Sequence, residues 1–249
     1  MANPLIAGNW KMHGTTGSAA QLATELAKQW GDNSAAQMIV FPPAVHIAAV
    51  ASALAGSSIA IGAQNLSQKE SGAFTGEVSA AMLADLGCRY VLVGHSERRA
   101  IFGETSATVA EKFVAAQAQG LVPILCVGET LQQRQQGQTM AVVTEQIATV
   151  VEKAGLERVC DGVIAYEPVW AIGTGETASP QQAQQVHQDI RAQLGGSGVN
   201  TSLLYGGSVN ANNAGQLFGQ PDIDGGLVGG ASLEADGFLN IAQQLIEQQ

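Results

Sequence analysis

The most constraining feature of this 249-residue chain is a series of short runs rich in valine, isoleucine and leucine. Eight such runs recur along its length, at residues 5–7, 38–41, 59–61, 90–93, 121–127, 162–166, 202–205 and 223–228. Most are continuously apolar rather than alternating, which is typical of parallel strands that are covered on both faces. The runs therefore predict eight buried parallel strands.

The stretches between these runs have the period of one-faced helices. Apolar residues recur at intervals of three and four at Ala19, Leu22, Ala23, Leu26, Ala27 and Trp30, and again at Val143, Ile147, Val150, Val151 and Ala154. Ser179 and Pro180 predict the start of a helix over 181–194. Eight strands alternating with helices in about 250 residues are typical of a closed (β/α)8 barrel. We expect one α/β domain over residues 1–249, with a doubly wound sheet as the alternative.

Composition limits the partners that we expect. The chain is 46% hydrophobic and only 13% charged, so it should bury a large core rather than remain disordered. Its formal charge of -10 repels polyanions, which argues against nucleic acid as a partner. Cys88, Cys126 and Cys160 have no metal-ligand or CxxC spacing, so we expect buried thiols in a reducing, cytoplasmic setting. Residues 33–68 carry no charge, but proline and glycine divide them into pieces too short to span a membrane.

Polar residues directly after strands are the candidates for a functional site, because the carboxyl ends of parallel strands share one face. Asn9 and Lys11 follow the first run, His95 the fourth and Glu167 the sixth. A poorly hydrated carboxylate at Glu167 suits a general base. The helix expected after His95 disfavours imidazolium, so a neutral ring is predicted there. Taken singly, each residue has a structural alternative: a surface Glu, a core His or an exposed Lys.

Glycine-rich turns supply a second pattern. They lie at residues 173–175, 206–208 and 229–232, each after a predicted strand. Such turns present backbone N–H groups to an anion, and the last two follow strands seven and eight, where barrels of this kind commonly bind phosphate. The chain has no motif for nucleotide hydrolysis, zinc proteolysis or serine esterase chemistry.

Eight segments spread over the whole chain carry a family resemblance. They are AGNWKM at 7–12, AQN at 63–65, GAFTGE at 72–77, VGHSERR at 93–99, CVGE at 126–129, AYEPVWAIGTG at 165–175, YGGSV at 205–209 and VGGA at 228–231. Together they resemble the triosephosphate isomerases. The resemblance implies a TIM barrel that interconverts dihydroxyacetone phosphate and D-glyceraldehyde 3-phosphate, in glycolysis and gluconeogenesis, without cofactor or metal.

The resemblance also implies a role for each site residue. Glu167 would be the base that moves a proton between adjacent carbons through an enediolate, while neutral His95 polarises the carbonyl oxygens. Asn9 and Lys11 would stabilise the developing charge, and Glu97 would either orient Lys11 or shuttle a proton. The substrate and its phosphate would be held by Asn9, Lys11, Gly173, Ser208, Gly229 and Gly230.

A lid and a dimer contact follow from the same resemblance. The lid would comprise Pro168, Val169, Trp170, Ala171, Ile172, Gly173, Thr174, Gly175, Glu176 and Thr177. Its closure would protect the enediolate from losing phosphate. Phe74 and Thr75 would reach into a second subunit of a homodimer, beside the Asn9 and Lys11 of that subunit. Cys126 would be structural, and His13, His46 and His187 are expected on the surface.

Two other functions remain as alternatives. One is a barrel enzyme that isomerises a bulkier sugar or anthranilate phosphate; the short loop after the eighth run and the segment Trp170-Ala171-Ile172 favour a smaller closed pocket. The other is an inactive barrel retained as a binding protein. Loss of Lys11, His95 or Glu167 would have indicated it, and all three are present.

Overall fold

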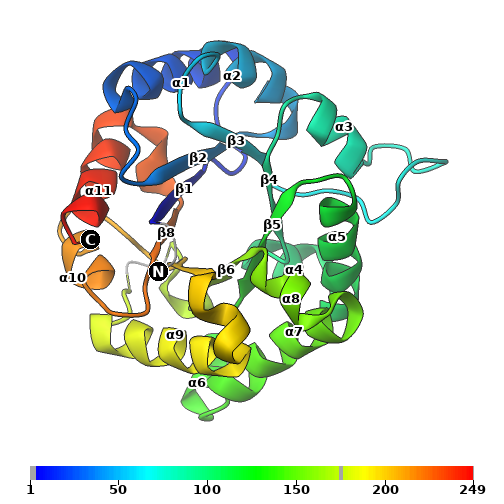
Figure 1. Cartoon of the computed structure of the whole chain (residues 1–249), viewed down its shortest axis with the longest axis vertical. Coiled ribbons are helices and arrows are strands. Elements are labelled where there is room, and N and C mark those ends of the chain that lie inside the picture. Colours follow the sequence, from blue (N-terminus) through cyan, green and yellow to red (C-terminus); the bar gives the residue numbers. More distant parts are fainter. Residues whose placement is uncertain (1–3, 174–175, 249) are drawn as a thin grey trace.

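The eight predicted strands form a closed parallel barrel in which each strand pairs with its neighbours in chain order (Figure 1). The computed structural model describes residues 4–173 and 176–248. The strands are β1 (Leu5–Asn9), β2 (Gln37–Phe41), β3 (Ala60–Ala63), β4 (Tyr90–Val93), β5 (Val122–Val127), β6 (Val163–Tyr166), β7 (Ser202–Tyr205) and β8 (Gly225–Val228). Because β1 pairs with β8 as well as with β2, the (β/α)8 barrel is confirmed and the doubly wound sheet is wrong.

Helices surround the barrel as an outer ring (Figure 1). The α-helices are α1 (Thr16–Trp30), α2 (Ile47–Ala53), α3 (Ala80–Asp85), α4 (Ser96–Phe102), α5 (Ser106–Ala118), α6 (Leu131–Gln135), α7 (Thr139–Ala154), α8 (Leu156–Cys160), α9 (Pro180–Leu194), α10 (Ala214–Phe218) and α11 (Ala235–Glu247). Short 3-10 turns are η1 (Ala44–His46), η2 (Val169–Ala171), η3 (Gly195–Asn200) and η4 (Gly230–Leu233). The start of α9 is as predicted: the Ser179 hydroxyl accepts the N–H of Gln182 at 3.1 Å, and Pro180 is the first helical residue.

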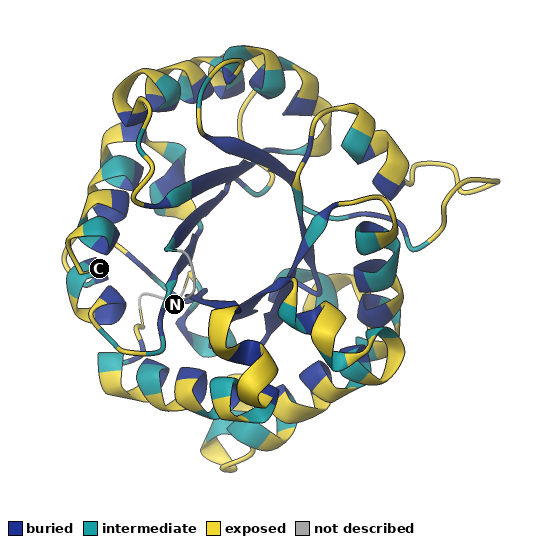
Figure 2. Cartoon of the chain, in the orientation of Figure 1, coloured by how far each residue is buried: buried dark blue, intermediate teal, exposed yellow. Residues whose placement is uncertain are grey.

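The strands are buried on both faces, which explains their continuous apolar runs (Figure 2). On β5, Ile124 and Cys126 point into the barrel, whereas Leu125 and Val127 pack against the helices. A small cluster therefore fills the barrel interior, and a larger one joins the barrel to the helix ring. No helix among the described residues has the length and apolar character needed to cross a membrane.

Two histidines and one cysteine differ from the sequence prediction in how far they are buried. His187 lies on the inner side of α9 and is completely buried, where its Nδ1–H donates to the Ala183 carbonyl at 2.8 Å. His46 is also buried, and its Nδ1 lies 3.2 Å from the Thr16 hydroxyl. The surface prediction is wrong for both histidines, and each buried ring has a polar partner. Cys160 is partly exposed at the end of α8, while Cys88 and Cys126 are buried as predicted.

Candidate active site

A cavity of about 250 Å³ opens at the carboxyl ends of the strands. Ile172 and Leu227 contribute apolar walls to it. The predicted substrate and catalytic residues that line it are Asn9, Lys11, His95, Glu167, Gly173, Ser208, Gly229 and Gly230. This volume lies below the range of about 300–1,000 Å³ of most drug-sized ligand pockets, so the cavity suits a small polar ligand.

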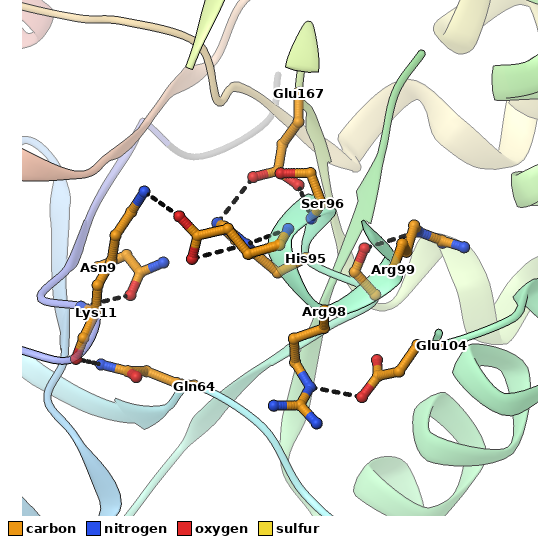
Figure 3. Close-up of polar contacts among 11 residues, drawn as sticks. Asn9, Lys11, Gln64, His95, Ser96, Arg98, Arg99, Glu104 and Glu167 are labelled. Carbon is orange, nitrogen blue, oxygen red and sulfur yellow. Dashed lines mark hydrogen bonds and ion pairs between the residues drawn. The ribbon is translucent and has the colours of Figure 1, made fainter. Parts of the chain in front are cut away.

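His95 is held at the start of α4, where it is the N-cap residue. Its Nδ1 accepts the backbone N–H of Glu97 at 3.2 Å, so that nitrogen carries a lone pair and the ring proton lies on Nε2. Nε2 is 3.0 Å from Oε1 of Glu167 (Figure 3). The backbone of the helix terminus therefore sets the tautomer and directs a donor at the carboxylate.

Opposing influences act on the pKa of the His95 ring. Burial lowers the pKa of His95, but the carboxylates of Glu167 and Glu97 more than offset it, so the pKa lies above its ordinary value of 6.5. Lys11 opposes this rise in the pKa. The protonation of the ring therefore depends on where the Glu167 side chain lies.

Glu167 is almost completely buried, directly after β6. Its Oε2 accepts the backbone N–H of Ser96 at 2.8 Å, and its own N–H donates to the Val127 carbonyl at 2.7 Å. A Cβ at Gly128 would lie 1.8 Å from the Glu167 carbonyl oxygen, so only glycine permits this approach of the backbones. Sequence reasoning missed Ser96 as a contact of the carboxylate, because a backbone N–H gives no signal in the residue type.

Lys11 adopts an uncommon backbone conformation, with a φ of 50°. Its N–H donates to the Asn9 side chain at 3.0 Å, and the Gln64 amide donates to its carbonyl at 2.8 Å. Its Nζ lies 2.5 Å from Oε1 of Glu97 (Figure 3). Sequence reasoning did not include Gln64 in the site, although it directly follows β3.

The charge of Glu97 is set by the same neighbours. Burial raises the pKa of Glu97, but Lys11 and His95 outweigh this effect, so the pKa lies below its ordinary value. Glu97 does not line the 250 Å³ cavity itself. The closest described contact of its carboxylate within the site is with the Lys11 ammonium.

The glycine-rich turns line the same 250 Å³ cavity as Lys11, His95 and Glu167. Gly229 is close to Lys11, because a Cβ at this glycine would lie 3.4 Å from the Lys11 Cε. The Ser208 N–H donates to the Ala171 carbonyl at 3.0 Å. In this structure that amide is therefore engaged with the expected lid, and a phosphate would have to replace the Ala171 carbonyl to bind it.

The first part of the expected lid is fixed to the barrel through Glu129. The buried Glu129 carboxylate accepts the Trp170 indole N–H and the Tyr166 hydroxyl, each at 3.1 Å. Arg134 stacks on the Trp170 ring, with its guanidinium carbon 4.5 Å from the ring centre. Sequence reasoning missed this role of Glu129. Thr174 and Gly175 lie outside the described residues.

The expected dimer contacts lie apart from the cavity. Phe74 and Thr75 are exposed in the loop between β3 and α3, which projects away from the barrel (Figure 1). Next to the active site lies a second cavity of about 400 Å³, whose walls include Lys11, Met12 and Phe102. Among the described residues, no group of three or more histidine, cysteine or acidic side chains could hold a metal ion.

Comparisons with known proteins agree with this geometry. The sequence model described as triosephosphate isomerase matches residues 4–245. A triosephosphate isomerase of Alcanivorax borkumensis is 54% identical over 96% of this chain and 97% of its own length. One from Pseudomonas putida is 54% identical, with 96% of each chain covered, and one from Dechloromonas aromatica is 53% identical over 98% and 99%. The chain therefore belongs to the triosephosphate isomerase family and is an enzyme that interconverts the two triose phosphates.

Proposed function

We propose that Glu167 is the base of this isomerisation and that His95 polarises the substrate oxygens. The observation that carries the proposal is the meeting of the His95 Nε2–H and the Glu167 carboxylate, 3.0 Å apart, in a cavity that Lys11 also lines. Glu167 removes a proton from the carbon next to the substrate carbonyl, and returns it to the other carbon. The substrate oxygens replace Glu167 as the acceptor of the His95 N–H, which stabilises the enediolate between these steps.

Lys11 and the glycine-rich turns bind the charged parts of the substrate. The Lys11 ammonium supplies a positive charge in a protein whose formal charge is -10, and this charge attracts the phosphate. Asn9 fixes the turn at Lys11 and lines the same cavity. The backbone amides of Gly173, Ser208, Gly229 and Gly230 bind the phosphate oxygens.

We infer that residues 168–177, of which the structure describes 168–173 and 176–177, act as a lid over this site. Ile172 and Gly173 already line the cavity, and the Ser208–Ala171 bond joins the lid to the turn after β7. When the Ser208 amide turns to the phosphate, this bond is released, so substrate binding is coupled to lid movement. A closed lid excludes water and keeps the enediolate from losing its phosphate.

The test is a pair of substitutions assayed with dihydroxyacetone phosphate in deuterated water. Glu167→Gln removes the basic oxygen but keeps the shape of the side chain, so kcat should fall by about 10³-fold or more while binding of inorganic phosphate changes little. Glu157→Gln, at an exposed position on α8, should leave kcat unchanged. The wild type should place deuterium on the sugar as the aldehyde forms. Near-native turnover by Glu167→Gln would refute the assignment of the base.

We also propose a homodimer that works in the cytoplasm. Large apolar side chains are exposed near the projecting loop and the second cavity, namely Met12, Val45, Phe74, Met82, Ile101 and Phe102. The loop that carries Phe74 and Thr75 projects away from its own barrel, and in the proposed dimer it enters the 400 Å³ cavity of the second copy. The three free cysteines fit a reducing compartment, and the negative net charge opposes nucleic acid binding.

A further inference from the structure

Arg99 joins the ends of two strands behind the catalytic pair. It lies on α4, and its Nε donates to the Gly94 carbonyl at 2.8 Å (Figure 3). Its Nη2 donates to the Cys126 carbonyl at 3.2 Å, and its Nη1 lies 3.5 Å from the Ser106 hydroxyl. One planar guanidinium therefore fixes the turn after β4 relative to the end of β5.

The two carbonyl groups are adjacent to the catalytic residues. Gly94 directly precedes His95 and has a φ of +73°, and a Cβ there would lie 2.8 Å from Nη2 of Arg99. Cys126 precedes Val127, whose carbonyl accepts the Glu167 N–H at 2.7 Å. A shift in the Arg99 guanidinium would therefore move the backbone on both sides of the 3.0 Å contact between His95 and Glu167.

The positive charge of Arg99 has no carboxylate at ion-pair distance among the residues that the structure describes, whereas Arg98 and Arg134 each have one and Arg191 has two. Arg99 and Glu167 line the same cavity of about 240 Å³, on the outer side of the catalytic carboxylate. Burial lowers the pKa of the Arg99 guanidinium, while Cys126 and then Glu167 act to raise it. The guanidinium and the catalytic carboxylate are thus within electrostatic reach of each other.

Other titratable groups lie on the elements that surround Glu167. His95 at the start of α4 contacts the carboxylate, and Lys11 after β1 lines the 250 Å³ cavity together with Glu167. Burial raises the pKa of the Cys126 thiol well above its ordinary value, and it raises that of Tyr205 on β7 to about 12. Those two groups are neutral at neutral pH. Arg99 is therefore the permanent positive charge on the outer side of Glu167.

We propose that Arg99 is a positioning residue for the isomerisation, which sets the separation of His95 and Glu167 and places a positive charge on the outer side of the Glu167 carboxylate. The proposal rests on the proposed role of Glu167 as the base. Two effects follow, one geometric and one electrostatic. Substitutions at Arg99 separate them, because lysine keeps the charge but loses the planar group that spans two carbonyls.

The experiment measures kcat/KM for dihydroxyacetone phosphate against pH. The ionisation of the substrate phosphate is common to all variants, so differences between profiles belong to the enzyme. Arg99→Gln should lower the plateau value of kcat/KM by about 10- to 100-fold. It should also move the acid limb of the profile, where kcat/KM falls with decreasing pH, to higher pH by about 0.5 unit or more. Arg99→Lys should lower the plateau but leave the acid limb in place. Arg158→Gln, which removes an exposed charge on α8, should match the wild type.

A second pair of variants tests the charge without removing Arg99. Ser106 is the first residue of α5, where a carboxylate is favourable for the helix. Ser106→Asp places a negative charge beside the guanidinium, so the acid limb should move to higher pH by a smaller amount than in Arg99→Gln. Ser106→Asn has nearly the same shape without the charge and should leave the limb in place. This pair remains informative if Arg99→Gln does not fold.

Specific outcomes would overturn the proposal. Equal acid limbs for Ser106→Asp and Ser106→Asn, or for Arg99→Gln and Arg99→Lys, would show that the charge of Arg99 does not act on the base. A wild-type plateau in both Arg99 variants would exclude the positioning role. Glu167→Gln distinguishes these failures from failure of the proposed base, since its turnover depends on Glu167 whatever Arg99 does.

Discussion

At the scale of single residues, the pKa of His95 depends on the charge of the Glu167 carboxylate. Glu167 contributes most to the rise in the His95 pKa, both by its charge and by its hydrogen bond, while burial acts in the opposite direction. Glu167→Gln should therefore lower the His95 pKa relative to the wild type. Glu97→Gln should lower it less, because the charge of Glu97 contributes less than Glu167.

The measurement is a pH titration of 13C-labelled histidine rings by NMR, with His95→Gln used to assign the signal. A raised pKa in the folded state means that His95 contributes stability below pH 6.5, which is lost as the pH rises through the folded-state pKa. Thermal unfolding of the wild type should show this loss relative to His95→Gln. An unchanged pKa of His95 in Glu167→Gln would contradict the 3.0 Å contact.

At the scale of elements, the proposed lid contains a backbone conformation that proline cannot adopt. Gly173 has a φ of +68°, whereas the proline ring requires a φ near −65°. Gly173→Pro should impair lid closure, so that inorganic phosphate and methylglyoxal appear beside the aldehyde product. Gly56→Pro alters an exposed glycine with a φ of +83°, far from the cavity, and should leave the product pure. Unchanged product purity in Gly173→Pro would contradict the protective role of the lid.

At the scale of the whole molecule, the two ends of the barrel have separate tasks. Opposite the active site, Arg191 pairs with Asp222 at 2.8 Å and with Asp224 at 2.7 Å, just before β8. Arg191→Met leaves these carboxylates without their cation, so stability should fall by about 3 kcal/mol. Urea unfolding should show this loss in the free energy of unfolding, while kcat stays unchanged. The control Arg158→Met, at an exposed position, should have little effect on the free energy of unfolding or on kcat. A fall in kcat at full occupancy of the folded state would mean that the two ends are coupled.

The proposed dimer belongs to the same scale. Phe74→Asp places a charge where an apolar side chain would enter a second copy, so sedimentation should show monomers, and activity should fall by about 100-fold as the region around Lys11 loses its cover. Val199→Asp changes an exposed apolar residue in η3 and should leave both properties unchanged. A Phe74→Asp variant that stays dimeric and active would exclude this contact.

The sequence alone determined the barrel and most of the residues at its mouth. Buried parallel strands are continuously apolar, so their number and order are visible in the chain, and Lys11, His95 and Glu167 lie within two residues of the strand ends. The resemblance to a family then supplied their chemistry. The same patterns could not show which face of α9 carries His187, because a polar residue on an apolar side was read as surface.

The tertiary structure decided how those residues act on one another. The Ser96 N–H on Glu167, the Glu129 carboxylate below Trp170 and the Arg99 guanidinium between two strand ends all join segments distant in sequence. Each of these bonds uses a backbone group or a buried charge, and neither leaves a periodic signal in the chain. The number of strands follows from local hydrophobicity along the chain. The hydrogen-bond partners follow from closure of the barrel, because closure brings these distant groups within 3.2 Å of one another.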